Sequence, residues 1–195
     1  MLQILTINFI IHATWLLWLL LAAVWLGFVP FVKPTLRRNT SMRFLLHIAP
    51  VGLGLYLLFG RPERPAMLNE QAFSVTVPIA FAGFVLALCG IAFSIWARCI
   101  LDGNWSSSAT VKQAHDLVRG GPYRMTRHPI YTGLLLALLG SALERGLIRS
   151  LVAIPLCALG LWLKLLVEEQ VMIKRFGEEY LRYRREVPAL APFLF

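Results

Sequence analysis

Charged residues are scarce in this sequence: they make up 15% of its 195 residues, whereas a soluble domain carries about 25%. Cysteine is also rare, and Cys89, Cys99 and Cys157 show no CxxC spacing. The pattern supports neither a disulfide framework nor a zinc site, and we expect packed, reduced thiols. No GxGxxG motif follows a strand-like segment, so nothing indicates a Rossmann-type nucleotide domain.

Long apolar blocks dominate what is present, with 58% of the residues in the hydrophobic set. A transmembrane helix needs about 20 predominantly apolar residues. The first block has no basic segment before it and is too long for a signal-peptide core, so we interpret it as a retained span. We predict an all-α polytopic membrane protein with about five transmembrane helices, at residues 8–32, 44–60, 73–101, 129–143 and 147–173.

The formal net charge is +9, which raises the question of nucleic-acid binding. The basic residues, however, lie at the ends of apolar blocks and form no face interleaved with exposed aromatic residues, so we expect no nucleic-acid partner. Fifteen of the 19 Lys and Arg residues fall in the first loop, in the stretch from Arg98 at the end of the third span to Arg127, and in the part from Lys164 onward. The positive-inside rule therefore predicts an N-terminus outside and a C-terminus in the cytoplasm.

Two features of the apolar blocks concern packing. We expect Trp15, Trp18 and Trp25 of the first block to be lipid- or interface-facing anchors rather than a ligand cage. Gly83 and Gly90 make the third block suitable for close helix packing. The sequence leaves open whether these glycines pack within the chain or between chains, and whether the protein is a monomer or a homodimer.

Residues 115–131 carry more polar side chains than anchoring at the membrane surface requires. The stretch 120–122, Gly-Gly-Pro, permits a sharp turn and close approach to a ligand. Arg127 and His128 stand directly before a helix start at Pro129, where free N–H groups and the helix dipole favour an anion such as a carboxylate. The alternative is that these basic residues only anchor the chain at the membrane surface.

A second polar segment lies in the fifth block. Lys164 and Glu168 are spaced i, i+4 and share a helix face. Ionisable residues at membrane depth usually face a cavity or a partner. The alternative is a mutual salt bridge with a snorkelling lysine. After a break at Gly177 the tail predicts an amphipathic helix that helps to close a site, or else a solvated tail.

The C-terminal half of the chain, from Leu101 to Pro192, resembles the isoprenylcysteine carboxyl methyltransferase family and, more distantly, phospholipid methyltransferases. The order and spacing of several short motifs carry the resemblance. These motifs are Gly103-Asn104-Trp105-Ser106, His115-x-Leu117-Val118-x-x-Gly121-Pro122-Tyr123, Arg127-His128-Pro129-x-Tyr131-x-Gly133, Glu168-Glu169 and Phe176-Gly177-x-Glu179-Tyr180-x-x-Tyr183.

The resemblance implies an S-adenosyl-L-methionine site, with S-adenosyl-L-homocysteine as product, built by residues 101–195, while residues 1–100 form the first three spans. It implies catalytic roles for Arg127, Lys164 and Glu168. Lys164 falls where the eukaryotic enzymes have an arginine, and an ammonium cannot reproduce the bidentate fork of that residue. The implied cofactor-binding residues are His115, Asp116, Leu117, Val118, Tyr123, His128, Pro129, Ile130, Tyr131 and Glu168.

The expected function is accordingly a membrane methyltransferase that acts on a carboxylate of a lipidated or amphiphilic acceptor. We expect a bacterial inner membrane location with the active site facing the cytoplasm, so its partners are the bilayer and the acceptor. Two alternatives stay open: an N- or S-methyltransferase of phospholipids or small amphiphiles, and a non-enzymatic carrier or sensor that retains the fold.

Overall fold

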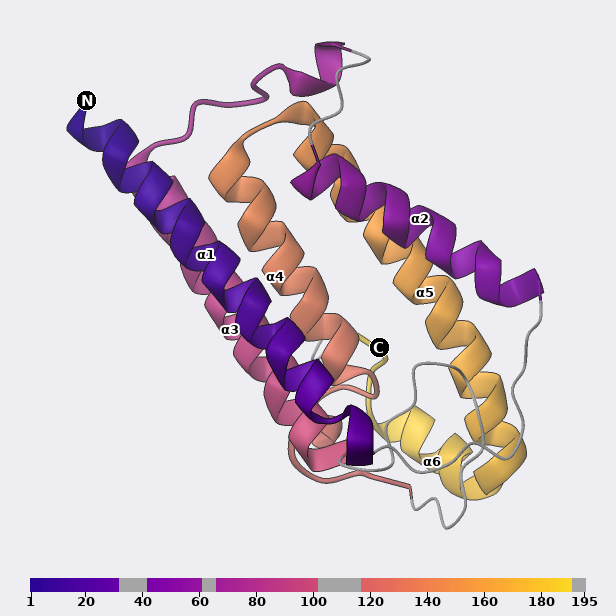
Figure 1. Ribbon diagram of the computed structural model, residues 1–195. Helices are drawn as coiled ribbons and strands as arrows, with labels where there is room; N and C mark the ends of the chain where they lie inside the picture. The colour runs from indigo at the N-terminus through magenta and orange to yellow at the C-terminus, as the bar shows by residue number, and fades with distance from the viewer. Residues whose placement is uncertain (32–41, 61–65, 102–116, 191–195) are drawn as a thin grey trace.

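The computed structural model describes residues 1–31, 42–60, 66–101 and 117–190, and in these segments the regular structure is helical (Figure 1). This confirms the all-α prediction. Within the described segments, short 3-10 turns accompany the helices: η1 (Val29–Phe31), η2 (Ala66–Asn69) and η4 (Gly121–Arg124). The six α-helices are α1 (Leu2–Gly27), α2 (Met42–Phe59), α3 (Val77–Leu101), α4 (Pro129–Arg145), α5 (Ile148–Phe176) and α6 (Glu178–Glu186).

Three of these helices, α1, α3 and α5, are long and apolar enough to cross a bilayer. Helices α2 and α4 are shorter, with 18 and 17 residues. The expected number of about five spans therefore rests on these two shorter helices crossing as well. That number, and the orientation of the chain, stay predictions.

The helices form two associated groups. Figure 1 shows α1, α3 and α4 running side by side, with α2 lying along α5 on the other side of the molecule. Helices α4 and α5 connect the groups through a tight turn at Gly146, whose φ of 62° is the left-handed conformation that favours glycine. The opposite end of the molecule, where α4 begins and α5 ends, also carries α6.

Close contacts between glycines hold α3 against α4. A Cβ at Gly83 would lie 2.6 Å from the carbonyl oxygen of Gly140, and a Cβ at Gly90 would lie 2.4 Å from that of Gly133. Only glycine permits backbones to approach this closely. The open question about Gly83 and Gly90 is thereby answered, because both pack within the chain.

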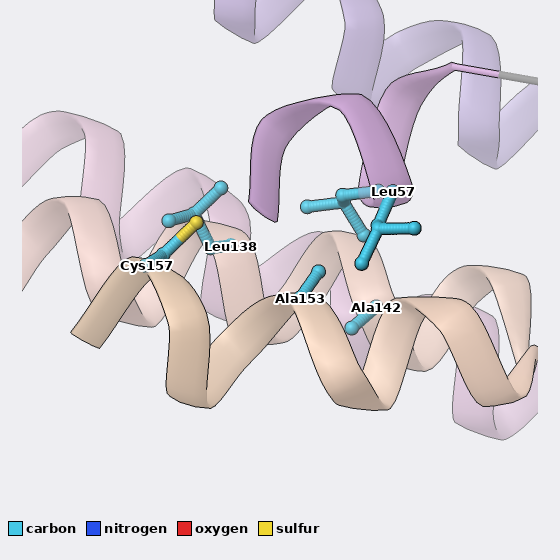
Figure 2. Packing of buried hydrophobic residues seen from close by; sticks show 6 residues of the cluster. Leu57, Leu138, Ala142, Ala153 and Cys157 are labelled. Carbon is cyan, nitrogen blue, oxygen red and sulfur yellow. The ribbon is translucent and has the colours of Figure 1, made fainter. Parts of the chain in front are cut away.

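The second group is built in the same way. A Cβ at Gly54 of α2 would lie 2.4 Å from Sγ of Cys157 on α5. Figure 2 shows the apolar cluster at this contact, where Leu57 of α2 and Leu138 of α4 surround Ala153 and Cys157. The expectation of packed, reduced cysteines is confirmed for Cys157. It is wrong for the other two, which are free but exposed on the outer surface of α3.

The tryptophans of α1 require a correction. Trp18 packs against the core and donates a hydrogen bond from Nε1 to Oγ of Ser141 on α4, at 3.0 Å. Trp25 packs against the same core. Trp15 alone is 39% exposed. The expected lipid- or interface-facing anchors therefore include two inward-packed residues, because α1 lies along α3 and α4 and turns one face toward them.

Candidate functional site

A polar cluster lies where the N-terminus of α4 meets the C-terminal part of α5. The hydroxyl of Tyr131 donates to Oε1 of Glu168 at 2.7 Å, and Nζ of Lys164 lies 3.8 Å from the same oxygen. The ammonium of Lys164 also sits over the Tyr131 ring, 5.2 Å from its centroid. The spacing i, i+4 thus brings Lys164 and Glu168 together as predicted, and a tyrosine from the neighbouring helix joins them.

His128 stands between two carboxylates. Its Nδ1 is 3.6 Å from Oε2 of Glu168, and its Nε2 is 3.6 Å from Oε1 of Glu169. The imidazole stacks parallel to the Tyr131 ring, with centroids 5.4 Å apart. Nε2 is buried and has no hydrogen-bond partner within the described part of the chain. Its nearest polar neighbour is Oε1 of Glu169, so this nitrogen faces the protein.

The two adjacent glutamates have different surroundings. Glu169 is 4% exposed; its Oε1 accepts a hydrogen bond from Nε of Arg127 at 2.8 Å and forms an ion pair with Nη2 of the same arginine, also at 2.8 Å. Nε of the half-exposed Arg184 lies 3.5 Å from its other oxygen. The Glu168 side chain is 20% exposed, and a carboxylate has about four acceptor positions. Glu168 therefore retains acceptor capacity for a cationic ligand group, whereas Glu169 is engaged with its neighbours.

The C-terminal segment covers the start of α4, and we call residues 178–190 the C-terminal strap. The backbone N–H of Arg127 donates to the carbonyl of Pro188 at 2.8 Å, and that of His128 donates to Ala189 at 3.0 Å. Arg127 Nη1 also donates to the carbonyl of Arg184 at 3.0 Å and to that of Val187. The N–H groups of the two residues that precede α4 are thus occupied by carbonyls of this strap, and in the first turn of the helix those of Tyr131 and Thr132 donate to the carbonyl of His128.

The strap is also fastened to η4 and to Arg119, which lies just before it. The hydroxyl of Tyr183 donates to the carbonyl of Tyr123 at 2.6 Å, and Arg119 donates to the carbonyl of Glu179 at 2.6 Å. Burial raises the pKa of Tyr183 above its ordinary value, and that of Tyr123 as well. Both phenols therefore remain protonated donors at neutral pH. The amphipathic helix expected after Gly177 is confirmed as α6, which lies against the candidate site.

The remaining predicted site residues lie around this cluster. Tyr123, Ile130 and Tyr131 belong to one apolar cluster, and Val118 packs against it. Pro129 is fully buried, and Leu117 packs against the tyrosines of α6. His115 and Asp116 lie outside the described residues. Sequence reasoning missed the fastening by Tyr183 and the strap carbonyls, for which the sequence carries no local signal.

Fold and site together define a class of protein: a multi-pass membrane protein with a carboxylate-containing polar cluster at one end of its helical bundle. The comparisons with known proteins identify its family. The sequence profile of the phospholipid methyltransferase family matches residues 79–179, which is more than half of the chain. The chain belongs to this family, and the resemblance recognised from its motifs is confirmed.

Several protein-S-isoprenylcysteine O-methyltransferases are similar in sequence. The Rattus norvegicus protein is 34% identical over 60% of this chain, and the Xenopus laevis protein is 28% identical over the same share. The Schizosaccharomyces pombe protein is 33% identical over 41% of this chain. The matched regions make up 42%, 41% and 34% of these relatives, so the chain spans less than half of their length.

A solved structure shares the fold. The structure of the eukaryotic intramembrane Ras methyltransferase, isoprenylcysteine carboxyl methyltransferase, superposes with a TM-score of 0.51 and 17% sequence identity. The match covers 81% of this chain and 55% of that one. The chain is thus a multi-pass membrane protein of the same fold.

Proposed function

We propose that the protein is an S-adenosyl-L-methionine-dependent methyltransferase that acts on an amphiphilic acceptor in the membrane. The observation that carries the proposal is the cluster around Glu168, in which a partly exposed carboxylate lies beside Lys164, Tyr131 and His128 at the end of a membrane-spanning helix. Membership of the phospholipid methyltransferase family supports the reaction class.

The residues present fit the cofactor. S-adenosyl-L-methionine supplies a methyl group on a sulfonium, and it also carries an ammonium, a carboxylate and an adenine. Glu168 retains acceptor capacity for the ammonium, and the His128 ring, which is stacked on Tyr131, borders the same carboxylate. Tyr131 and Tyr123 add aromatic surface beside these groups. We assign Glu168, His128 and Tyr131 to cofactor binding, with Leu117, Val118, Tyr123, Pro129 and Ile130 around them.

Lys164 is the residue we assign to the acceptor. It lies one helical turn from Glu168 toward the interior of α5, so an amphiphile that enters from the bilayer meets it before the carboxylate. Its 3.8 Å separation from Glu168 leaves ammonium donors for an anionic group of the acceptor. Lys164 would hold the acceptor carboxylate, and S-adenosyl-L-methionine, when bound, would supply the methyl group for an ester and leave as S-adenosyl-L-homocysteine.

A carboxylate acceptor needs no general base, because it is already ionised at neutral pH. The work of the site is then to align the reactants and exclude water. One observation favours a second candidate, methylation of an amine on a phospholipid or a similar amphiphile. An amine must lose a proton, and the buried imidazole of His128, flanked by two carboxylates at 3.6 Å, is placed to take it.

The same proposal includes an orientation. With the N-terminus outside, the polar cluster and α6 face the cytoplasm, where the cofactor is available, and an apolar acceptor arrives from the bilayer. Residues 1–100 then form the supporting spans and residues 101–195 the catalytic region. The basic residues around α6 agree with this orientation.

Transfer of labelled methyl groups tests the function. The purified protein in lipid nanodiscs is incubated with methyl-labelled S-adenosyl-L-methionine and either an S-farnesylcysteine analogue with a free carboxylate or phosphatidylethanolamine. Base-labile incorporation into the first identifies an ester, and base-stable incorporation into the second identifies an N-methyl product. Lys164→Met, which removes the charge but keeps the chain length, should abolish most transfer to the carboxylate.

Two results would contradict the proposed function. One is the absence of transfer to either acceptor and to a total lipid extract, with protein that remains folded and monodisperse. The other is turnover by a Glu168→Ala variant equal to that of wild type. Arg124→Ala serves as the matched control, because this exposed arginine of η4 lies outside the cluster.

A further inference from the structure

Arg127 makes contacts that are unexpected for a residue that holds a substrate. Its Nε and Nη2 both bind Glu169, and its Nη1 binds two carbonyls of the C-terminal strap, those of Arg184 and Val187. The side chain is 9% exposed. Each nitrogen of the guanidinium is thus engaged with the protein itself. The planar fork joins α5 to the strap, a geometry that a lysine cannot reproduce.

The backbone reinforces this connection. The N–H groups of Arg127 and His128, the two residues that precede α4, donate to Pro188 and Ala189, so the strap fixes the backbone where it enters this helix. His128 makes no side-chain cap of its own. The start of α4, which carries His128 and Tyr131 into the cluster, is therefore fixed by residues about 60 positions later in the chain.

The strap also reaches the apolar side of the candidate site. Ala189 and Leu190 pack against the cluster that contains Tyr131 and Leu165. Tyr131 is the residue that donates to Glu168, and Leu165 precedes that glutamate by three positions on α5. The end of the strap is thus adjacent to the side chains that the proposed function assigns to the cofactor.

We propose that the C-terminal strap is a wall of the methyltransferase site and that Arg127 is a positioning residue that latches it. Arg127 acts through Glu169 and the strap carbonyls, without touching the cofactor or acceptor. The claim that the strap lines the site rests on the proposed function. The claim that Arg127 holds the strap in place does not depend on any ligand. Loosening the strap anywhere along its length should then weaken ligand binding, including at positions far from the carboxylates.

Tyr183 provides the test of action at a distance. Its hydroxyl holds the strap through the carbonyl of Tyr123 and contacts neither glutamate among the described hydrogen bonds. Tyr183→Phe removes that one bond and keeps the ring packed against Tyr180. If Arg127 works by latching the strap, this remote change reproduces its effect in milder form. If Arg127 works by touching a ligand, the remote change has no effect on binding.

The experiment combines hydrogen exchange of strap amides with calorimetric titration of S-adenosyl-L-homocysteine, in nanodiscs. The variants are Arg127→Ala, Arg127→Lys and Tyr183→Phe, and the control is Arg185→Ala, an exposed residue of the same helix. We expect strap exchange to rise about tenfold or more in Arg127→Ala and about fivefold in Tyr183→Phe, since charged hydrogen bonds contribute more than neutral ones. Arg127→Lys should recover less than half of this protection.

We expect the affinity for S-adenosyl-L-homocysteine to fall as hydrogen exchange of the strap amides rises. Affinity for S-adenosyl-L-homocysteine falls in the same order, exchange in α2 and α3 stays unchanged, and Arg185→Ala matches wild type. Lower affinity in Arg127→Ala without faster strap exchange would contradict the claim that Arg127 holds the strap in place. Faster strap exchange with unchanged affinity would contradict the claim that the strap lines the ligand site. If wild type does not bind S-adenosyl-L-homocysteine, the proposed function and the wall fail together, and strap exchange alone still decides the latch.

Discussion

Gly90 offers a quantitative test of how the fold positions the site. An alanine Cβ there would lie 2.4 Å from the carbonyl oxygen of Gly133 and 2.6 Å from the backbone N of Ala137. Ordinary contact begins at 3.4 Å, so α3 and α4 would have to separate by about 1 Å. The obstructing atoms belong to the backbone of a packed helix, and no side-chain rotation can relieve the overlap.

The cost of this substitution follows from overpacking, which destabilises a packed core by about 1–3 kcal/mol. For a chain of this size that corresponds to a drop in Tm of roughly 2–12 °C. Because α4 carries His128 and Tyr131, its displacement should also reduce affinity for S-adenosyl-L-homocysteine. Gly52→Ala is the matched control: this glycine of α2 has open space around its Cβ position and should tolerate the change with no loss of stability.

Thermal unfolding in detergent, followed by tryptophan fluorescence and circular dichroism, measures both variants under one condition. A Gly90→Ala protein as stable as Gly52→Ala, with wild-type ligand affinity, would refute the close contact between α3 and α4. Equal destabilisation of both variants would show that the loss of a helical glycine, and not the distance to Gly133, determines the result.

Three further predictions concern hydrogen bonds. Tyr131→Phe removes the 2.7 Å donor to Glu168 and should weaken S-adenosyl-L-homocysteine binding about fivefold in calorimetry, with unchanged Tm; unaltered binding would contradict our placement of the cofactor. Thr14→Val leaves the buried carboxyl of Glu144 without its 2.5 Å donor and should cost about 1–3 kcal/mol in thermal unfolding, whereas a neutral result would contradict the contact. Because burial raises the pKa of Tyr183, its contribution to stability is complete below the unfolded value of 10.0 and is lost as pH rises toward the folded value. Burial raises the pKa of Tyr180 and Tyr123 as well, so strap exchange corrected for intrinsic rates should increase above about pH 10 in both proteins but more steeply in wild type than in Tyr183→Phe; parallel pH profiles would contradict this.

The sequence predicted the helices well because their apolar blocks are long and sharply bounded. Pro129 and Gly177 mark the start of α4 and the end of α5, as expected from proline at the first turn and glycine after the last. The inward packing of Trp18 was not predictable, because apolar residues surround α1 on all sides and its sequence does not distinguish a lipid-facing side from a protein-facing one.

The candidate site was also predictable from the sequence only in part. The i, i+4 spacing of Lys164 and Glu168 guaranteed their proximity on α5. The separate surroundings of Glu168 and Glu169 depend on which face of α5 meets Arg127, and adjacent identical residues carry no signal for that. The strap carbonyls that cap α4 are main-chain atoms, which any residue type supplies. Long-range backbone hydrogen bonds of this kind are therefore invisible in a single sequence.

Binding of S-adenosyl-L-homocysteine to wild type and Glu168→Gln in nanodiscs, measured by calorimetry, tests the central claim most directly. Glutamine keeps the size of the side chain and removes the charge that we assign to the ligand ammonium. We predict saturable binding to wild type and at least a tenfold weaker affinity in the variant, with equal Tm, as expected for a lost charge-assisted hydrogen bond. No binding to folded wild type, or equal affinity in both proteins, would contradict the account.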